Sequence, residues 1–311
     1  MAAYTIRKLA FTLVVMLGAA TLSFLLLHIT PGDPAEALAG PQATQDDVQR
    51  LRVSLGLDRP LPVQFGMYLR NLARGDLGRS YRTHRPVSAE IAARWPATFS
   101  LSLTSLGVAL AVGVPLGILA AVRRRTWVDF ALMVGALTGV SMPSFWLALI
   151  LIIVFSVKLK ALPFVGRDSL ASYILPSLTL GLGVAANIAR LTRASMLEVL
   201  GQDYIRTGRA KGLSGLRLLY VHALRNASIP IVTIVGLQLG TLLGGQVVTE
   251  TVFAWPGLGR MIVDSLLARD LLLVQGGILV LALTFVVINL LTDVAYGLLD
   301  PRIRLYARRQ V

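Results

Sequence analysis

The chain contains no cysteine and only three histidines. Without cysteine it forms neither disulfides nor thiolate metal sites, which excludes disulfide-stapled domains and cysteine-ligated zinc proteins. His28, His84 and His222 lie far apart in the chain, which disfavours a histidine metal cluster. The sequence therefore predicts a protein with no metal site of its own.

A Gly-Lys dipeptide is also missing from all 311 residues. The phosphate-binding loop GxxxxGK[ST] requires this dipeptide, because its lysine reaches the β- and γ-phosphates of a bound nucleotide. The chain therefore does not bind ATP through that motif.

Charge is scarce as well: 15% of the residues are charged and 55% are hydrophobic, against roughly 25% charged in soluble domains. Several apolar stretches reach the length of about 20 residues that a helix needs to cross a bilayer. Buried helices of a large soluble protein are the alternative, but such helices usually keep one polar stripe. The composition predicts an all-helical integral membrane protein.

The formal net charge of +14 raises the possibility of nucleic-acid binding. The basic residues, however, cluster at the ends of apolar spans instead of on one face or arm, as a nucleic-acid footprint would require. We therefore expect contact with membrane lipid and none with nucleic acid.

Six membrane spans are predicted, at about residues 9–29, 97–122, 130–157, 173–191, 227–249 and 274–299. A cleaved signal peptide is the alternative for the first, but its apolar run is longer than a signal h-region. The chain then divides into an N-terminal tail with the first span (1–29), an extracytoplasmic domain (30–96) and a core of five spans (97–311). Recurring apolar residues predict that 30–96 is folded, with a helix at about 46–57.

The fourth span is the least apolar, since it holds Pro176, Gly181, Gly183 and Asn187. Membrane helices tolerate proline and glycine where neighbouring helices or a water-filled cavity provide hydrogen-bond partners for the backbone groups left unpaired. This span is therefore predicted to lie inside the bundle.

Lysine and arginine in the short loops predict the orientation. With the N-terminus inside, the inner loops hold Arg7, Lys8, residues 123–125 and a dense cluster from 190 to 225, and the C-terminal tail adds four arginines. The short outer loops hold only five basic residues. Both termini are predicted to be cytoplasmic.

The loop between the fourth and fifth spans, residues 194–226, is long, basic and partly amphipathic. Gly212 interrupts a helix-like run, and a second helical segment starts at Ser214. A short surface helix on a turn is suited to docking in a groove of a soluble partner. The alternative is a basic loop that only sets topology.

The same loop resembles the EAA loop of ABC-importer permeases, in the variant of the dipeptide, oligopeptide and nickel family, first permease subunit. The resemblance covers nearly the whole chain. Its motifs are Pro31-Gly-Asp-Pro34, Leu55-Gly-Leu-Asp-Arg-Pro-Leu-Pro62, Gly75-Asp-Leu-Gly-Arg-Ser80, Ser141-Met-Pro-Ser-Phe-Trp146, Ala189-Arg-Leu-Thr-Arg-Ala-Ser-Met196, Arg206-Thr-Gly-Arg-Ala-Lys-Gly212, His222-Ala-Leu-Arg-Asn-Ala-x-x-Pro230, Phe253-Ala-Trp-Pro-Gly-Leu-Gly-Arg260 and Leu299-Asp-Pro-Arg302.

The resemblance implies the fold of a type I ABC importer permease, a non-catalytic role and a multi-pass location in a bacterial inner membrane. Its implied partners are a second, related permease in a heterodimer, two cytoplasmic ATPase domains that bind ATP and Mg, and an extracytoplasmic binding protein. It also implies ATPase coupling through residues 206–213: Arg206, Thr207, Gly208, Arg209, Ala210, Lys211, Gly212 and Leu213. One departure concerns the opening Glu-Ala-Ala of the general pattern, which is Arg206-Thr-Gly208 here, so the acidic residue is missing.

Small residues recur in the fifth span at Gly236, Gly240 and Gly244. This spacing lets helices approach closely, within the subunit or against a partner permease. Gln238 and Gln246 lie in the same span, and polar side chains at membrane depth face protein or water. They are candidates for the translocation path, with interhelical hydrogen bonding as the alternative.

Trp255 and Asn187 are the other two candidates for a path or gate. Residues 250–260 combine aromatics with Pro and Gly, which fits a structured loop at the outer mouth or against the binding protein; an interfacial aromatic anchor is the alternative. Asn289 and Asp293 lie in the inner half of the last span. The acidic Asp293 favours a structural ion pair with arginines of the basic loop over a proton relay.

The substrate follows from the family alone, whose members import peptides, glutathione or nickel chelates. Peptides are ranked first, with glutathione and nickel chelates as alternatives. An autonomous secondary transporter is the competing class, but it would be expected to carry internal repeats and its own coupling-ion site. A membrane-bound enzyme would need a nucleophile–base or metal constellation, and the sequence offers none.

Overall fold

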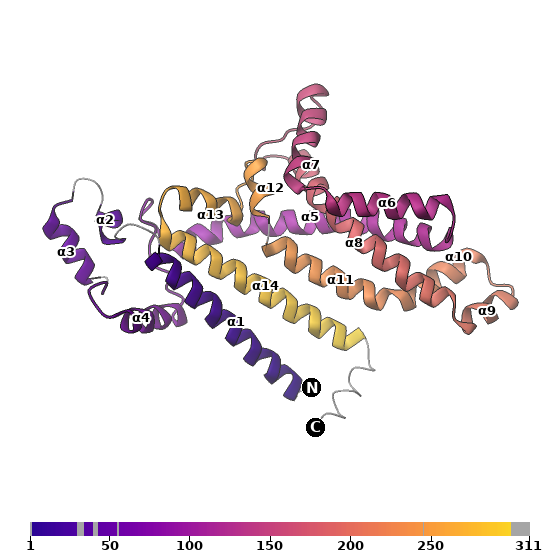
Figure 1. Ribbon diagram of the computed structural model, residues 1–311, viewed down its shortest axis with the longest axis horizontal. Helices are drawn as coiled ribbons and strands as arrows, with labels where there is room; N and C mark the ends of the chain where they lie inside the picture. The colour runs from indigo at the N-terminus through magenta and orange to yellow at the C-terminus, as the bar shows by residue number, and fades with distance from the viewer. Residues whose placement is uncertain (1, 30–33, 40–42, 55, 245, 300–311) are drawn as a thin grey trace. The chain divides into compact units, whose positions relative to one another are not determined.

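The structure is a computed structural model that describes residues 2–29, 34–39, 43–54, 56–244 and 246–299. The described chain is helical almost throughout (Figure 1). It splits into two compact units, each described by itself below. The N-terminal unit comprises Ala2–Thr98 and Pro256–Thr284, and the bundle unit comprises Phe99–Trp255 and the chain from Phe285.

The N-terminal unit contains α1 (Ala2–Ile29) and three short helices, α2 (Pro34–Ala39), α3 (Gln45–Ser54) and α4 (Leu61–Ala73). It also holds the first part of α5 (Val87–Val122), all of α13 (Leu258–Leu267) and the first part of α14 (Leu271–Leu299). The helix expected at 46–57 is α3. Packing of α4 on α1 relies on an aromatic cluster in which Phe24 meets Phe65 edge-on at 5.2 Å and Tyr68 stacked at 5.7 Å.

The bundle unit holds the rest of α5 and α14 and the helices between them. These are α6 (Trp127–Ser141), α7 (Ser144–Leu151), the π-helical η1 (Ile152–Lys158), the 3₁₀ turn η2 (Leu170–Tyr173), α8 (Ile174–Leu200), α9 (Asp203–Ala210), α10 (Gly215–Arg217), the π-helical η3 (Leu218–Ala223), α11 (Leu224–Gly244) and α12 (Val247–Val252).

Four helical segments in the described chain are long and apolar enough to cross a membrane, and a bent pair, α6 with α7 and η1, would make a fifth. They lie at Val87–Val122, Leu170–Leu200, Gly215–Gly244 and Leu271–Thr292. In α1 the apolar stretch Ala10–Leu26 is shorter, at the lower limit of a span. The predicted total of six crossings therefore stays a prediction.

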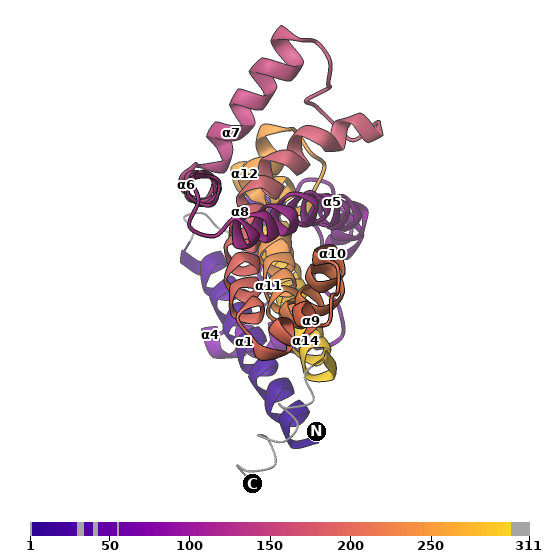
Figure 2. The same ribbon diagram turned by 90° about the vertical axis from the view of Figure 1, so that its right-hand side faces the viewer.

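The predicted span at 130–157 is wrong as a single helix. The chain breaks after Ser141, and α7 with η1 leaves α6 at 101°. The cause is Pro143, which lacks an N–H donor and forces the preceding residue out of the helical region: Met142 is extended, with φ −79° and ψ 123°. Figure 2 shows α7 pointing away from α6.

The second predicted span, 97–122, is part of a longer helix, α5, which begins at Val87. Pro96 suggested a boundary, but it lies inside the helix. Proline removes one backbone hydrogen bond from a helix, yet α5 continues through Pro96 to Val122.

Inside the bundle unit α8 is the central helix and packs against α6, α7, α11 and α12 (Figures 1 and 2). Twelve of its residues are buried, which confirms that the least apolar predicted span lies inside the bundle. Glycines let α5 approach it: Cβ atoms at Gly113 and Gly117 would each lie 2.6 Å from a carbonyl oxygen of α8, those of Ala185 and Ala189.

Gly117→Ala is expected to destabilise the folded protein by about 1–3 kcal/mol, the usual cost of overpacking a filled interior. The added methyl would overlap the backbone oxygen of Ala189, which cannot rotate away as a side chain could. Thermal unfolding in detergent measures the change. Gly107→Ala is the matched control, because it lies in the same helix and a Cβ added there would meet nothing within 4 Å. Equal stability of the two variants would contradict the predicted close contact.

Candidate functional site

The short helix α9 presents one face to solvent and buries the other. Ile205 and Gly208, three residues apart, are buried. Arg206, Thr207, Arg209 and Ala210, together with Lys211 after the helix, are exposed. The sequence analysis predicted that this segment docks to a partner. In the structure, one face of α9 is buried against the bundle unit and the other face is exposed and basic.

Gly212 ends α9 in a left-handed conformation, with φ 77°. The Gly212 N–H donates to the Arg209 carbonyl at 3.0 Å and the Leu213 N–H to the Gly208 carbonyl at 3.2 Å. This pair of bonds is a Schellman motif, which favours glycine at that position. The expected interruption at Gly212 is confirmed, and the second helical segment, α10, follows with Ser214 as its N-cap.

The anchored face of α9 belongs to an apolar cluster with α5, α8 and η3. Ile205 packs with Ile118, Met196 and Leu218. Gly208 matters here because a Cβ at this position would lie 2.8 Å from Leu218 Cδ1 and 3.3 Å from Leu213 Cδ1. Tyr204 adds a polar contact: its hydroxyl oxygen accepts a 2.9 Å hydrogen bond from Asn226 Nδ2 of α11. The helix is therefore held to several elements of the bundle unit.

A buried ion pair links α6 to α8 in the same unit. Arg193 donates to Asp129 through Nε at 2.6 Å and through Nη2 at 2.8 Å. Asp129 is 5% exposed, and it also accepts from the Arg125 N–H at 3.1 Å. We call these two residues, Asp129 and Arg193, the clamp. The sequence analysis did not predict this ion pair. A local signal exists at Asp129, because Thr126-x-x-Asp129 has the spacing of a capping box and the Thr126 hydroxyl caps α6.

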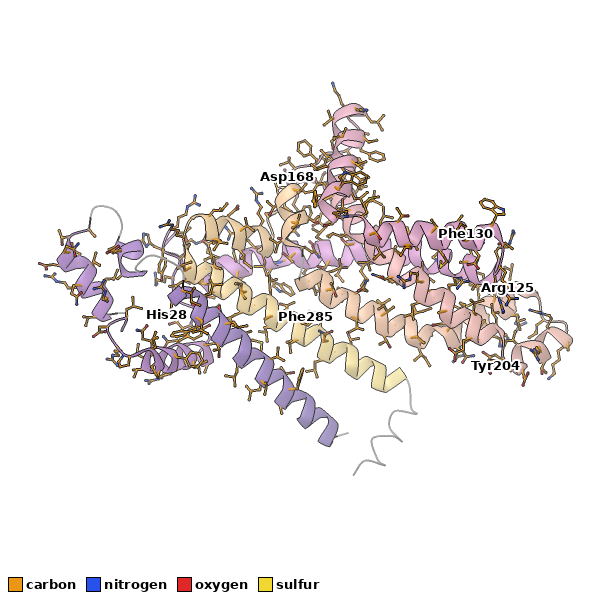
Figure 3. The ribbon with its side chains drawn as sticks, in the orientation of Figure 1. His28, Arg125, Phe130, Asp168, Tyr204 and Phe285 are labelled. Atoms are coloured by element: carbon orange, nitrogen blue, oxygen red, sulfur yellow. The ribbon has the colours of Figure 1, made fainter. Side chains whose placement is uncertain are left out.

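The three glycines of the fifth predicted span face α14 of the same chain. A Cβ at Gly236 would overlap Thr292, one at Gly240 would lie 3.4 Å from Phe285 and Asn289, and one at Gly244 would lie 3.7 Å from Phe285. Figure 3 shows Phe285 on α14. Asn289 Oδ1 is buried without a hydrogen bond among the described residues.

The path candidates occupy different environments. Gln246 is buried and donates from Nε2 to Ser102 Oγ at 2.6 Å, and its Oε1 has no described partner. Trp255 is 0% exposed and meets Tyr173 edge-on at 4.6 Å. Asn187 and Gln238 are half-buried, on α8 and α11. The role of these four residues in transport stays a prediction. Asp293 lies outside the described side chains.

The N-terminal unit holds a pocket of about 350 Å³ next to α13, and several charged and hydroxyl side chains line it. One wall comes from Pro256, Gly257 and Arg260, the end of the aromatic motif, and another from Ser80. Asp270 also lines the pocket, and its carboxylate accepts from the Ser80 hydroxyl and, at 3.2 Å, from the Tyr81 N–H. Sequence reasoning missed Asp270, which precedes an apolar helix without any motif around it.

Comparison with known proteins agrees with these features. Residues 113–305 match the family described as "Binding-protein-dependent transport system inner membrane component", and residues 1–102 match its N-terminal companion family. The glutathione transport system permease protein GsiC of Escherichia coli K12 is 49% identical over 97% of this chain and 98% of its own. The GsiC protein of Salmonella choleraesuis is 48% identical over the same shares.

Solved structures show the same fold at lower identity. Two inward-facing structures of the MetNI methionine ABC transporter match with TM-scores of 0.54 and 0.57, at 20% and 19% identity. Each covers 68% of this chain and 96% of the matched chain.

These matches confirm the predicted family, the ABC importer permease fold and the multi-pass inner-membrane location, and they place ATP on the ATPase subunits of the transporter. The chain belongs to the binding-protein-dependent transport system inner membrane components and is a non-catalytic permease subunit of an ABC importer.

Proposed function

We propose that this permease carries glutathione, or a closely similar short anionic peptide, across the inner membrane. The observation that carries the proposal is the 49% identity over 97% of the chain to glutathione permeases. Sequence reasoning ranked peptides first and glutathione as an alternative; these relatives favour the alternative. Glutathione is itself a tripeptide, so the two readings differ little in size and charge. None of the relatives named above favours nickel.

The partners in this proposal are a second related permease, two cytoplasmic ATPase domains and an extracytoplasmic binding protein that delivers the solute. Both termini of the chain would lie in the cytoplasm, with six crossings. The pocket at Arg260 in the N-terminal unit would then face the binding protein, as expected for the loop at 250–260. Exposed polar groups at its rim support this: Arg82 and Asp264 are both exposed there.

The exposed face of α9 would dock to an ATPase domain. Arg206, Arg209 and Lys211 give this face its charge, and the buried Ile205 and Gly208 tie it to the bundle unit. A loop that only set topology would need the basic residues but not this anchoring. Tighter ATP binding to the closed arrangement of the ATPase domains would shift the equilibrium toward that arrangement. On closure, α9 would move as a rigid lever.

The family membership places the chain among ABC importers and not among secondary transporters, and three of its buried carboxylates agree with this. Glu90 is paired with Arg94, Asp129 is held by Arg193, and Asp270 accepts hydrogen bonds from the loop at Ser80. Because these carboxylates already form structural ion pairs or hydrogen bonds, they do not provide a free binding site for a coupling ion.

Uptake by the reconstituted transporter tests the proposal. The complete complex, with ATPases and binding protein, is placed in vesicles, and ATP-dependent uptake of labelled glutathione is measured. Unlabelled glutathione should compete far better than a neutral dipeptide or a nickel chelate. Uptake by the permeases without ATPase would instead establish a secondary transporter, and competition by the nickel chelate alone would refute the substrate.

A further inference from the structure

A groove of about 890 Å³ lies in the bundle unit beside α9. Its walls come from the end of α5, the end of α8 and the segment from Arg209 to Leu219. Leucines of α8 and of that segment line one part of it. Three arginines, Arg124, Arg125 and Arg209, line the rest. The groove therefore combines an apolar floor with a cationic rim.

The cationic rim is not neutralised within the described part of the chain. No acidic residue lines the groove, and the ion pairs of the described residues involve other arginines, such as Arg193 and Arg206. Arg124, Arg125 and Arg209 are all exposed. Three positive charges on one rim favour an anionic ligand, and their exposed donors suit phosphate oxygens.

The backbone holds two of these arginines in a fixed turn. Arg125 has φ 61°, a left-handed conformation that a residue other than glycine adopts only at a cost and that marks candidate functional positions. The turn is fixed by the Arg125 N–H, which donates to Asp129 of the clamp. Because the clamp engages the backbone and not the side chain, the guanidinium stays available.

Exposed aromatic and apolar side chains place the groove at the level of the membrane surface. Trp127 is 79% exposed and Phe130 72% exposed on the first turn of α6, and Figure 3 shows Phe130 near Arg125 at this end of the bundle unit. Aromatic residues of this kind gather where lipid head groups meet hydrocarbon. Val122 and Leu216, which line the groove, are also exposed.

We propose that this groove binds an anionic phospholipid of the cytoplasmic leaflet, with the phosphate on the three arginines and an acyl chain along the leucines. Basic pockets between membrane helices on the cytoplasmic side bind such head groups. The proposal rests on the orientation given under the proposed function. Since Arg209 belongs to α9, the lipid would contact the coupling element itself.

Binding of fluorescent phosphatidylglycerol to the purified full-length permease in neutral-lipid nanodiscs tests this. The variant R124Q/R125Q/R209Q should bind roughly a hundredfold more weakly, because each arginine near an anionic lipid surface contributes about fivefold. R124K/R125K/R209K keeps the charge and should retain most of the binding. The matched control R190Q/R217Q/R225Q removes the same charge from exposed positions outside the groove and should bind like the unchanged protein.

Three results would overturn the proposal. One is equal loss in the control, which would mean bulk attraction between charges. Another is displacement of the lipid by inorganic phosphate alone, which would make the groove a site for free anions. The third is loss of the lipid when the ATPases are added, which would make an ATPase segment the occupant. The measurement needs no transport, so a failure of glutathione uptake leaves its result unaffected.

Discussion

Gly212→Val is expected to lower ATP-dependent uptake roughly 5- to 30-fold while the subunit still inserts into the membrane. A side chain in the left-handed region costs about 1–2 kcal/mol, which changes a two-state population by that factor. Gly212 has φ 77°, and a Cβ added there would meet only open space, so the penalty comes from the backbone and not from a clash. The strained turn would release the two hydrogen bonds that end α9.

Two control variants separate this backbone effect from a change in composition. Gly212→Asn should retain much of the uptake, because asparagine tolerates the left-handed region better than other side chains. Gly215→Ala has open space and an ordinary backbone conformation and should transport normally. Uptake in vesicles and the rate of ATP hydrolysis are measured together. Unimpaired uptake by the valine variant would indicate that the loop only sets topology.

Asp129→Ala is expected to destabilise the permease by about 3 kcal/mol, the lower end of the range for breaking a buried ion pair. The lower end applies because the Arg193 side chain is 29% exposed. Water therefore solvates part of the charge that the missing carboxylate no longer balances. The variant also removes the acceptor for the Arg125 N–H. Unfolding in detergent, followed by circular dichroism, measures the loss.

The double variant Asp129→Leu/Arg193→Leu completes the test of the clamp. Removing both charges leaves no unpaired ion, so most of the lost stability should return. Thr126→Ala is a milder comparison, since loss of an N-cap costs about 1 kcal/mol. If the double variant were as unstable as Asp129→Ala, the ion pair would not be the source of the effect.

The bend at Pro143 shows where local patterns stop being informative. The apolar composition of 130–157 predicts a single span, because hydropathy averages over a window and does not sense direction. The chain instead turns by 101° at Met142–Pro143. Pro96, by contrast, leaves α5 unbroken. The two prolines have opposite effects on the helix, and the sequence alone does not report this.

The loop at 194–226 is the part of the site that local sequence predicts best. Its helix, the glycine that ends it and the second helical segment all follow from local rules for helix ends, and α9, Gly212 and α10 occupy those positions. The predicted limits of the loop are too wide, because α8 extends to Leu200 and α11 begins at Leu224.

The sequence by itself determined that the protein is helical and embedded in a membrane, where α9 lies and to which family it belongs. These properties depend on composition, on periodicity and on residues adjacent in the chain. Only the tertiary structure paired Asp129 with Arg193, 64 residues apart, and joined Ser80 to Asp270. It alone gathered three arginines around one groove. Such pairings depend on which helices pack together, and packing is decided by side-chain shape across long separations in sequence, which no local pattern encodes.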